Sequence, residues 1–189
     1  KLAGGDGILE NALLQYYDLF KNADSLGSLI HIDDDRESLV DQKTLMKKLG
    51  QALKKETDTG DPVAETFGET ANAIMKAVEY LSRNDFHLVV TNPPFLSSIK
   101  QSEKIKLFCG NKYKFGKNDL ATSFLIRCQK FCEYNCIYSI ISPESWLSIK
   151  SYSNIRLSLI KNQSIIFVVK LGARAFETIS GEIVKVALM

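Results

Sequence analysis

The tetrapeptide Asn92-Pro93-Pro94-Phe95, which directly follows an apolar run, constrains the fold of this chain more than any other feature. Residues 86–91 have the length and the β-branched content of a buried strand. Two successive prolines fix φ and lack a backbone N–H, so the strand has to end here and Asn92 is held extended. Open α/β sheets bind their ligands at the carboxyl ends of strands. The sequence therefore predicts an asparagine side chain at the binding rim of an α/β sheet.

The residue types in this tetrapeptide favour one kind of chemistry. An exocyclic amine is a weak nucleophile because its lone pair is delocalised, and an enzyme that alkylates it needs acceptors for both N–H hydrogens. The Asn92 side-chain oxygen and the Pro93 carbonyl supply two acceptors, and Phe95 offers a face on which a planar ring can stack. Orientation and fixed dipoles then supply the rate without a general base. The alternative is an ordinary proline-terminated strand with Phe95 in the core.

Length and charge set the class of protein and of partner. The chain has 189 residues, 45% of them hydrophobic and 24% charged, which suits one domain or part of one. A formal net charge of +2 gives no strong overall attraction to a polyanion. A local basic patch interleaved with aromatic residues does follow the tetrapeptide, and it is either a nucleic-acid contact or a solvated loop. Its lysines are Lys100, Lys104, Lys106, Lys112, Lys114 and Lys117.

The cysteines and serines exclude other chemistries. Cys128, Cys132 and Cys136 recur at helical spacing, which predicts free thiols along the apolar stripe of one helix rather than metal ligands, since no Cys-x-x-Cys pair exists. Ser142 and Ser145 lie outside any Gly-x-Ser-x-Gly elbow, so a hydrolase is disfavoured. The absence of a signal peptide and of a transmembrane stretch predicts a cytoplasmic protein with no membrane contact.

The first 85 residues predict helices. Apolar recurrence indicates a helix over 8–22, followed by a turn and a short extended piece over 29–32. Residues 33–85 read as an insertion of two helices, the first capped at Asp41 and the second beginning at Asp61-Pro62, joined by a turn at 57–60. The second helix has an apolar face for packing, formed by Val63, Phe67, Ala71, Ile74, Val78 and Leu81.

After the tetrapeptide the pattern alternates between helix and strand. We expect a helix over 119–133, a strand over 137–141, a helix over 152–162, and strands over 164–169 and 183–188 that pair antiparallel. The predicted fold class is α/β, with a mixed sheet of parallel strands plus a carboxyl-terminal antiparallel pair. We divide the chain into an N-terminal core part (1–32), a helical insertion (33–85) and the catalytic half of the core (86–189).

Several segments, taken in order, resemble motifs of adenine-specific N6 DNA methyltransferases. These segments are Asn92-Pro93-Pro94-Phe95, Asp119-Leu120-Ala121-Thr122-Ser123-Phe124, Ser142-Pro143-Glu144-Ser145-Trp146 and Leu171-Gly172-Ala173-Arg174-Ala175-Phe176. The chain most closely resembles the large PglX methyltransferases of BREX-type phage-defence systems and related restriction-modification enzymes. The similarity runs over about residues 20–189 and is strongest from Phe86 onward. It implies a partial Rossmann-like class I methyltransferase fold.

The resemblance also implies a reaction and roles for residues. The reaction is transfer of a methyl group from S-adenosylmethionine to the N6 amine of an adenine flipped out of duplex DNA. Asn92 and the Pro93 carbonyl would accept the amine hydrogens, Pro94 would shape the turn, and Phe95 and Phe176 would stack on or contact the base. Asp24 and Asp119 match positions near the cofactor. Duplex DNA is the implied partner, with subunits of a defence complex as further candidates.

This sequence departs from the family pattern in one respect, and two other interpretations stay open. The strand and Gly-rich loop that cradle the methionine part of the cofactor are not visible, so we expect a segment of a larger protein that is inactive in isolation. The same Asn-Pro-Pro-aromatic geometry also serves enzymes that methylate a protein glutamine or an RNA guanine. A non-catalytic module that docks DNA or partner subunits is the third interpretation.

Overall fold

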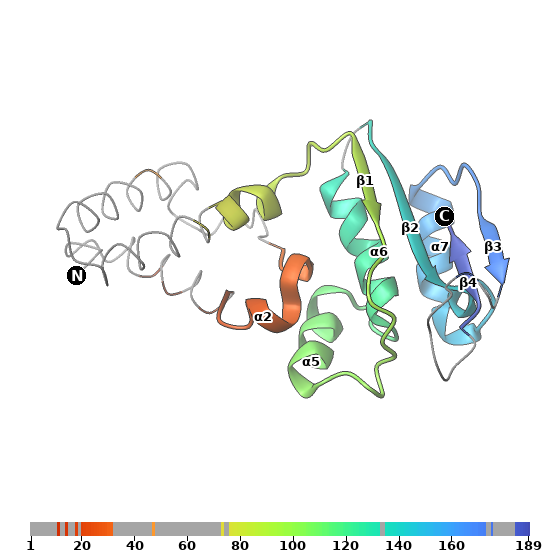
Figure 1. Ribbon diagram of the computed structural model, residues 1–189, viewed down its shortest axis with the longest axis horizontal. Helices are drawn as coiled ribbons and strands as arrows, with labels where there is room; N and C mark the ends of the chain where they lie inside the picture. The colour runs from red at the N-terminus through yellow and green to blue at the C-terminus, as the bar shows by residue number, and fades with distance from the viewer. Residues whose placement is uncertain are drawn as a thin grey trace. The chain divides into compact units, whose positions relative to one another are not determined.

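The computed structural model describes residues 11, 14, 18, 20–31, 47, 73, 76–132, 135–172, 175 and 184–189, drawn in colour in Figure 1. The chain divides into two compact units, Lys1–Arg83 and Asn84–Met189.

In the first unit the described residues other than Ile30, His31 and Arg83 are helical or lie in turns. Helix α2 (Ala23–Leu26) leads into a 3-10 turn, η1 (Gly27–Leu29), and residues 76–82 are helical. Residues 11, 14, 18 and 20 are helical too, as the pattern over 8–22 predicts. The prediction that an extended piece begins at Leu29 was wrong at its first residue, because Leu29 is the last residue of the 3-10 turn. Gly27, at φ 49°, turns the chain there. Asp41, Asp61-Pro62 and the predicted turn at 57–60 lie outside the described residues.

The second unit is built on a mixed four-stranded sheet, which confirms the predicted fold class. Its strands are β1 (Leu88–Thr91), β2 (Ile137–Pro143), β3 (Val169–Gly172) and β4 (Val186–Leu188). They lie in the order β1-β2-β4-β3, with β1 and β2 parallel and both pairings of β4 antiparallel (Figure 1). Because β1 and β2 are parallel, their carboxyl ends share one edge of the sheet.

Two helices pack against this sheet through one core. Helix α6 (Leu120–Phe131) follows the Asp119 cap, and α7 (Ser153–Asn162) follows two short 3-10 turns, η2 (Glu144–Leu147) and η3 (Lys150–Tyr152). Both helices occur where the sequence predicts them. The buried cluster that joins them to β2 consists of Leu125, Ile140, Trp146, Tyr152, Ile155, Leu159 and Met189.

Strand β1 is half-buried on one face and exposed on the other, which corrects the prediction of a buried strand. Leu88 and Val90 are 62% and 71% exposed, and Ile137, the partner of Leu88 in the register, is 56% exposed. Ile140, which pairs with Thr91, is fully buried on the opposite face. The apolar run indicates a strand correctly, but whether both of its faces are covered depends on neighbours far away in the sequence.

Helix α5 (Glu103–Lys112) lies in the lysine-rich segment that the sequence analysis interprets either as a nucleic-acid contact or as a solvated loop. Local signals for it were present. Ser102 caps it by accepting the Ile105 N–H at 3.5 Å, Glu103 lies in the first turn and Lys112 in the last. The lysine-rich composition conceals the weak apolar periodicity, and that is why the helix was missed.

The predicted strand over 164–169 begins too early. Strand β3 starts only at Val169, while Ile165, Ile166 and Phe167 precede it and are 43%, 72% and 51% exposed. Strand β4, the partner of β3, has only three residues, and its pairing with β3 ends at Val169↔Leu188. The apolar run therefore has no backbone partner over 164–168 among the described residues, and its β propensity alone does not make a strand.

The prediction that Cys132 and Cys136 are free thiols on a helix was also wrong. Helix α6 ends at Phe131, Cys132 is its C-cap at φ −120° and ψ 70°, and Asn135 takes a left-handed φ of 50°. This turn brings the two cysteines to a Cα–Cα distance of 5.1 Å, and they are joined by a disulfide. Cys109 and Cys128 are free and buried.

Candidate active site

Residues 92–95 lie at the carboxyl end of β1, as the two prolines predict. Asn92 and Pro94 are exposed, Pro93 is buried and Phe95 is half-buried. The buried Pro93 ring anchors the turn and leaves the neighbouring Asn92 side chain at the surface. In the described part of the chain, no protein group hydrogen-bonds the Asn92 carboxamide. Its oxygen is therefore available to an external N–H donor.

The backbone just after Phe95 is fixed to the start of α6. Leu120 N donates to Leu96 O at 2.9 Å, and Ser98 N donates to Asn118 O at 2.9 Å. Ser97 and Asp119 form an isolated antiparallel bridge. These contacts hold residues 96–98 and 118–120 against each other. The backbone that follows Phe95 is therefore fixed and is not a free loop.

Asp119 is the polar centre of this contact. It is 8% exposed, and its Oδ1 accepts the N–H of Ala121 at 2.8 Å. Burial raises the pKa of this carboxyl above its ordinary value, while hydrogen bonds from the backbone N–H groups of Ala121 and Leu96 act in the lowering direction. Asp119 thus caps α6 and ties it to the residue after Phe95. Its predicted contact with a cofactor remains a prediction.

The loop after β2 contributes a second set of residues to the same edge. Trp146 is 2% exposed, and its Nε1 donates to Ser142 Oγ at 2.8 Å, so this ring packs in the core. The pKa of Tyr152 is raised by burial and by the charge of Asp119, against a hydrogen bond with Ser145. Tyr152 therefore lies near Asp119. Sequence reasoning placed Tyr152 only at a helix start, and no local motif signals its position at the rim.

Side chains join these loops into one rim. Arg156 Nη1 donates to Trp146 O at 2.6 Å and to Ile149 O at 2.8 Å, which fixes the loop after β2. Asn118 Nδ2 donates to Ser151 O at 3.1 Å, which connects that loop to the start of α6. The turn after β1, the cap of α6 and the loop after β2 are thus hydrogen-bonded into a single edge.

Two predicted site residues are not among the described residues of the second unit. Asp24 lies in α2 of the first unit, where it is exposed. Phe176 falls outside the described residues. The structure therefore brings together residues 92–95 and Asp119, and the roles of Asp24 and Phe176 stay predictions.

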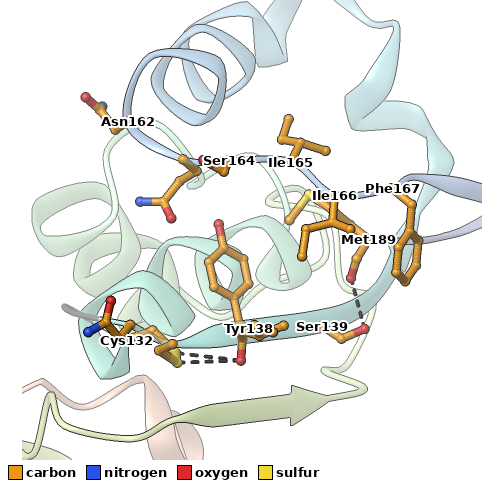
Figure 2. A pocket seen from close by; sticks show the side chains of 13 residues that line it. Cys132, Tyr138, Ser139, Asn162, Ser164, Ile165, Ile166, Phe167 and Met189 are labelled. Atoms are coloured by element: carbon orange, nitrogen blue, oxygen red, sulfur yellow. Dashed lines mark hydrogen bonds between the residues drawn. A yellow bond between two sulfur atoms is a disulfide. The ribbon is translucent and has the colours of Figure 1, made fainter.

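A cavity of about 460 Å³ lies at the other end of β2. Figure 2 shows Tyr138 and Ser139 of β2 beside Ile166, Phe167 and Met189 around it. All of its lining residues are neutral, and none belongs to residues 92–95. None of residues 92–95 lines this cavity, so the proposed amine-holding geometry and the cavity are separate features.

The described residues show neither a membrane-spanning helix nor a metal-binding group. Within them, no helix combines the length and the hydropathy that crossing a bilayer requires. They contain no group of three or more His, Cys, Asp or Glu side chains that is placed to hold a metal ion.

With this geometry in place, comparison with known proteins identifies the family. Residues 12–176 match the Eco57I restriction-modification methylase family. The chain belongs to this family. The match confirms the resemblance on which the sequence interpretation relied, and the mixed sheet agrees with it.

Curated relatives extend the comparison. The adenine-specific methyltransferase BrxX of Escherichia coli O9:H4 (strain HS) is 28% identical over 185 residues, covering 97% of this chain and 15% of BrxX. The adenine-specific methyltransferase PglX of Lacticaseibacillus casei (strain Zhang) is 33% identical over 102 residues, covering 54% of this chain and 8% of PglX. The chain therefore spans a small part of the length of either relative.

Proposed function

We propose that this member of the Eco57I methylase family is the part of an adenine-specific DNA methyltransferase that holds the target amine. One observation carries the proposal: the Asn92 carboxamide is exposed, without a protein partner among the described residues, and anchored at the carboxyl end of β1 by the buried Pro93. The BrxX and PglX relatives are adenine-specific methyltransferases, which supports adenine over a protein glutamine or an RNA guanine.

In this proposal the chain orients an adenine that has been flipped out of duplex DNA. The two N6 hydrogens donate to Asn92 Oδ1 and to the Pro93 carbonyl, which concentrates the lone pair on N6. Phe95 stacks on the ring and keeps the amine pointed in one direction. As the new N–C bond forms, the methyl–sulfur bond of the cofactor would break and leave its sulfur neutral. N6 becomes positively charged, and the two acceptors stabilise that charge until one hydrogen leaves as a proton to water.

S-adenosylmethionine supplies the electrophilic methyl group when it is bound. Asp24 and Asp119 are the residues proposed to contact it. Asp24 fits this role because its carboxylate is exposed. The Asp119 carboxylate caps α6 by accepting the Ala121 N–H, and the Leu96 N–H also acts on its pKa. Asp119 therefore shapes the edge at which a cofactor would lie. Phe176 remains the proposed second contact to the base. We place the parent protein in the cytoplasm with its DNA substrate, and defence-complex subunits are further proposed partners.

Substitution of Asn92 in the full-length protein tests the proposal. Asn92→Ala removes one of two preorganised acceptors and is expected to lower the rate of tritiated methyl transfer to duplex DNA by about a hundredfold or more. Asn154→Ala is the matched control, since Asn154 is an exposed asparagine of α7 whose side chain forms no hydrogen bond among the described residues. Full activity of Asn92→Ala would overturn the proposed role, as would transfer to protein or RNA in place of DNA.

A further inference from the structure

The segment between Ser97 and Asn118, which we term the α5 lobe, leaves the sheet edge and returns to it at a single point. Its two ends are joined by the Ser98 N to Asn118 O hydrogen bond of 2.9 Å and by the Ser97↔Asp119 bridge. Phe95 lies two residues before the lobe begins. Anything held at residues 92–95 therefore lies at the base of the lobe.

The lobe has a packed interior that fixes it to the start of α6. Cys109 is fully buried and Tyr113 is 2% exposed. The carbonyl of Gly116 accepts hydrogen bonds from Thr122 Oγ1 at 2.6 Å and from Ser123 Oγ at 3.1 Å. A Cβ at Gly116 would overlap the backbone carbonyl of Thr122, so the lobe approaches α6 as closely as glycine allows. Its outer surface is consequently held in a defined orientation.

The lobe concentrates the positive charge of the chain. It contains six lysines and one glutamate, a net charge of +5, whereas the whole chain carries +2, so the remaining residues carry −3. Lys106 is partly neutralised by Glu103 at 3.0 Å. Lys104 and Lys114 are exposed and form no ion pair among the described residues. A positive region of this kind attracts a polyanion that the nearly neutral chain as a whole does not.

Apolar side chains are exposed between the lysines. Ile99 is 88% exposed, Leu107 is 66% exposed and Phe115 is 48% exposed. Nucleic-acid-binding surfaces combine cations for phosphates with apolar groups that contact sugars and base faces. The α5 lobe therefore presents both kinds of group on one short segment.

We propose that the α5 lobe is the surface that contacts the DNA backbone next to the target base. The inference rests on the proposed function, because a flipped adenine remains covalently joined to the phosphates on either side of it. Those phosphates must pass beside the amine site, and the lobe that carries the lysines begins two residues after Phe95. The lobe positions the duplex without reading its sequence, since lysine contacts to phosphates carry no base information.

Binding of a fluorescent 30-base-pair duplex to the full-length protein, without cofactor and over a series of salt concentrations, tests this surface. Lys104→Gln/Lys114→Gln is compared with Lys130→Gln/Lys161→Gln, which removes two exposed lysines in the last turns of α6 and α7. Losing two phosphate contacts is expected to reduce the slope of log K against log salt by about 1.8 and to weaken binding at least about tenfold at physiological salt. Duplexes with and without a target adenine should weaken equally.

The outcomes separate the two proposals. If the lobe variant matches the control in affinity and in slope, the lobe is not the backbone contact, even if Asn92→Ala abolishes methylation. If the lobe variant shows the reduced slope while Asn92→Ala stays fully active, the backbone surface stands and the proposed amine site fails. Weakening that depends on the target adenine would also count against the lobe as a sequence-independent contact.

Discussion

Asp119, whose carboxylate is buried, pairs with Ser97 in an antiparallel bridge two residues beyond Phe95. This relationship links the proposed base-stacking residue to the first turn of α6, because the same carboxylate caps that helix through Ala121 at 2.8 Å. A substitution at Asp119 should therefore affect the order of both the backbone after Phe95 and the first turn of α6.

We predict that Asp119→Asn and Asp119→Ala have different effects. Asparagine is as good an N-cap as aspartate, whereas alanine loses the cap at a cost of about 0.5–2 kcal/mol. Asp119→Ala should therefore speed amide hydrogen exchange in residues 120–123 by roughly 2- to 30-fold, the exchange equivalent of that cost. Asp119→Asn should stay close to wild type. Equal exchange in all three proteins would show that the cap does not hold this turn.

The pH dependence of Asp119 is a separate prediction. Burial raises its pKa above 3.8, so the folded state binds this proton more tightly than the unfolded state does. The contribution of Asp119 to stability is then full below pH 3.8 and decreases as pH rises through the raised pKa. The stability of Asp119→Asn relative to wild type should accordingly improve between pH 3.5 and pH 7. Protection factors that change in parallel for both proteins over this range would contradict the assignment.

The sequence predicted the parts of this fold that local residues determine. The tandem prolines end β1, Asp119 caps α6, and the alternating pattern locates β2 and α7, because each depends on residues within a few positions. Strand β3 was predicted to begin five residues too early, and β1 was predicted to be buried although one of its faces is exposed. Both outcomes depend on partners far away along the chain, which a local pattern does not report.

The candidate site divides in the same way. Residues 92–95 are recognisable because proline geometry and the asparagine side chain act locally. Tyr152 at the rim is not, since its position near Asp119 arises from the packing of two loops that lie about thirty residues apart in the sequence. The lysines of the α5 lobe were visible as a composition, and the structure adds that the two ends of the lobe meet two residues after Phe95.

Two glycines of the α5 lobe should respond oppositely to alanine. At Gly116 a Cβ meets the Thr122 carbonyl and the Ile126 side chain, so Gly116→Ala is expected to destabilise the lobe by about 1–3 kcal/mol. At Gly110, inside α5, a Cβ meets open space, and Gly110→Ala should stabilise the helix by about 0.5–1 kcal/mol. Hydrogen exchange of residues 103–118 measures both effects. Destabilisation by both variants would mean that the packing at Gly116 is not the cause.

Cys128 and Cys109 should resist alkylation in the folded protein. Burial raises the pKa of the Cys128 thiol to about 11, and burial also raises that of Cys109. At pH 8 only about one Cys128 thiol in a thousand is then ionised, and the thiolate is the reactive form. Iodoacetamide followed by peptide mass spectrometry should find both residues unmodified until denaturant is added. Rapid labelling of native Cys128 at pH 8 would show that the α6 core opens readily.

Phe95 should matter for catalysis through its ring rather than through its bulk alone. A stacked base gains about 1–3 kcal/mol from an aromatic partner, so Phe95→Ala should lower kcat/KM for DNA by roughly 5- to 150-fold, whereas Phe95→Tyr should stay within about threefold. Phe167→Ala is the matched control, because Phe167 is 51% exposed and lines the cavity at the opposite end of β2. Initial rates of methyl transfer by the full-length protein give these ratios, and 2-aminopurine fluorescence at the target position reports the stacking directly. If Phe95→Ala and Phe167→Ala behave alike in both assays, the base stacks elsewhere and the geometry proposed for the amine must be revised.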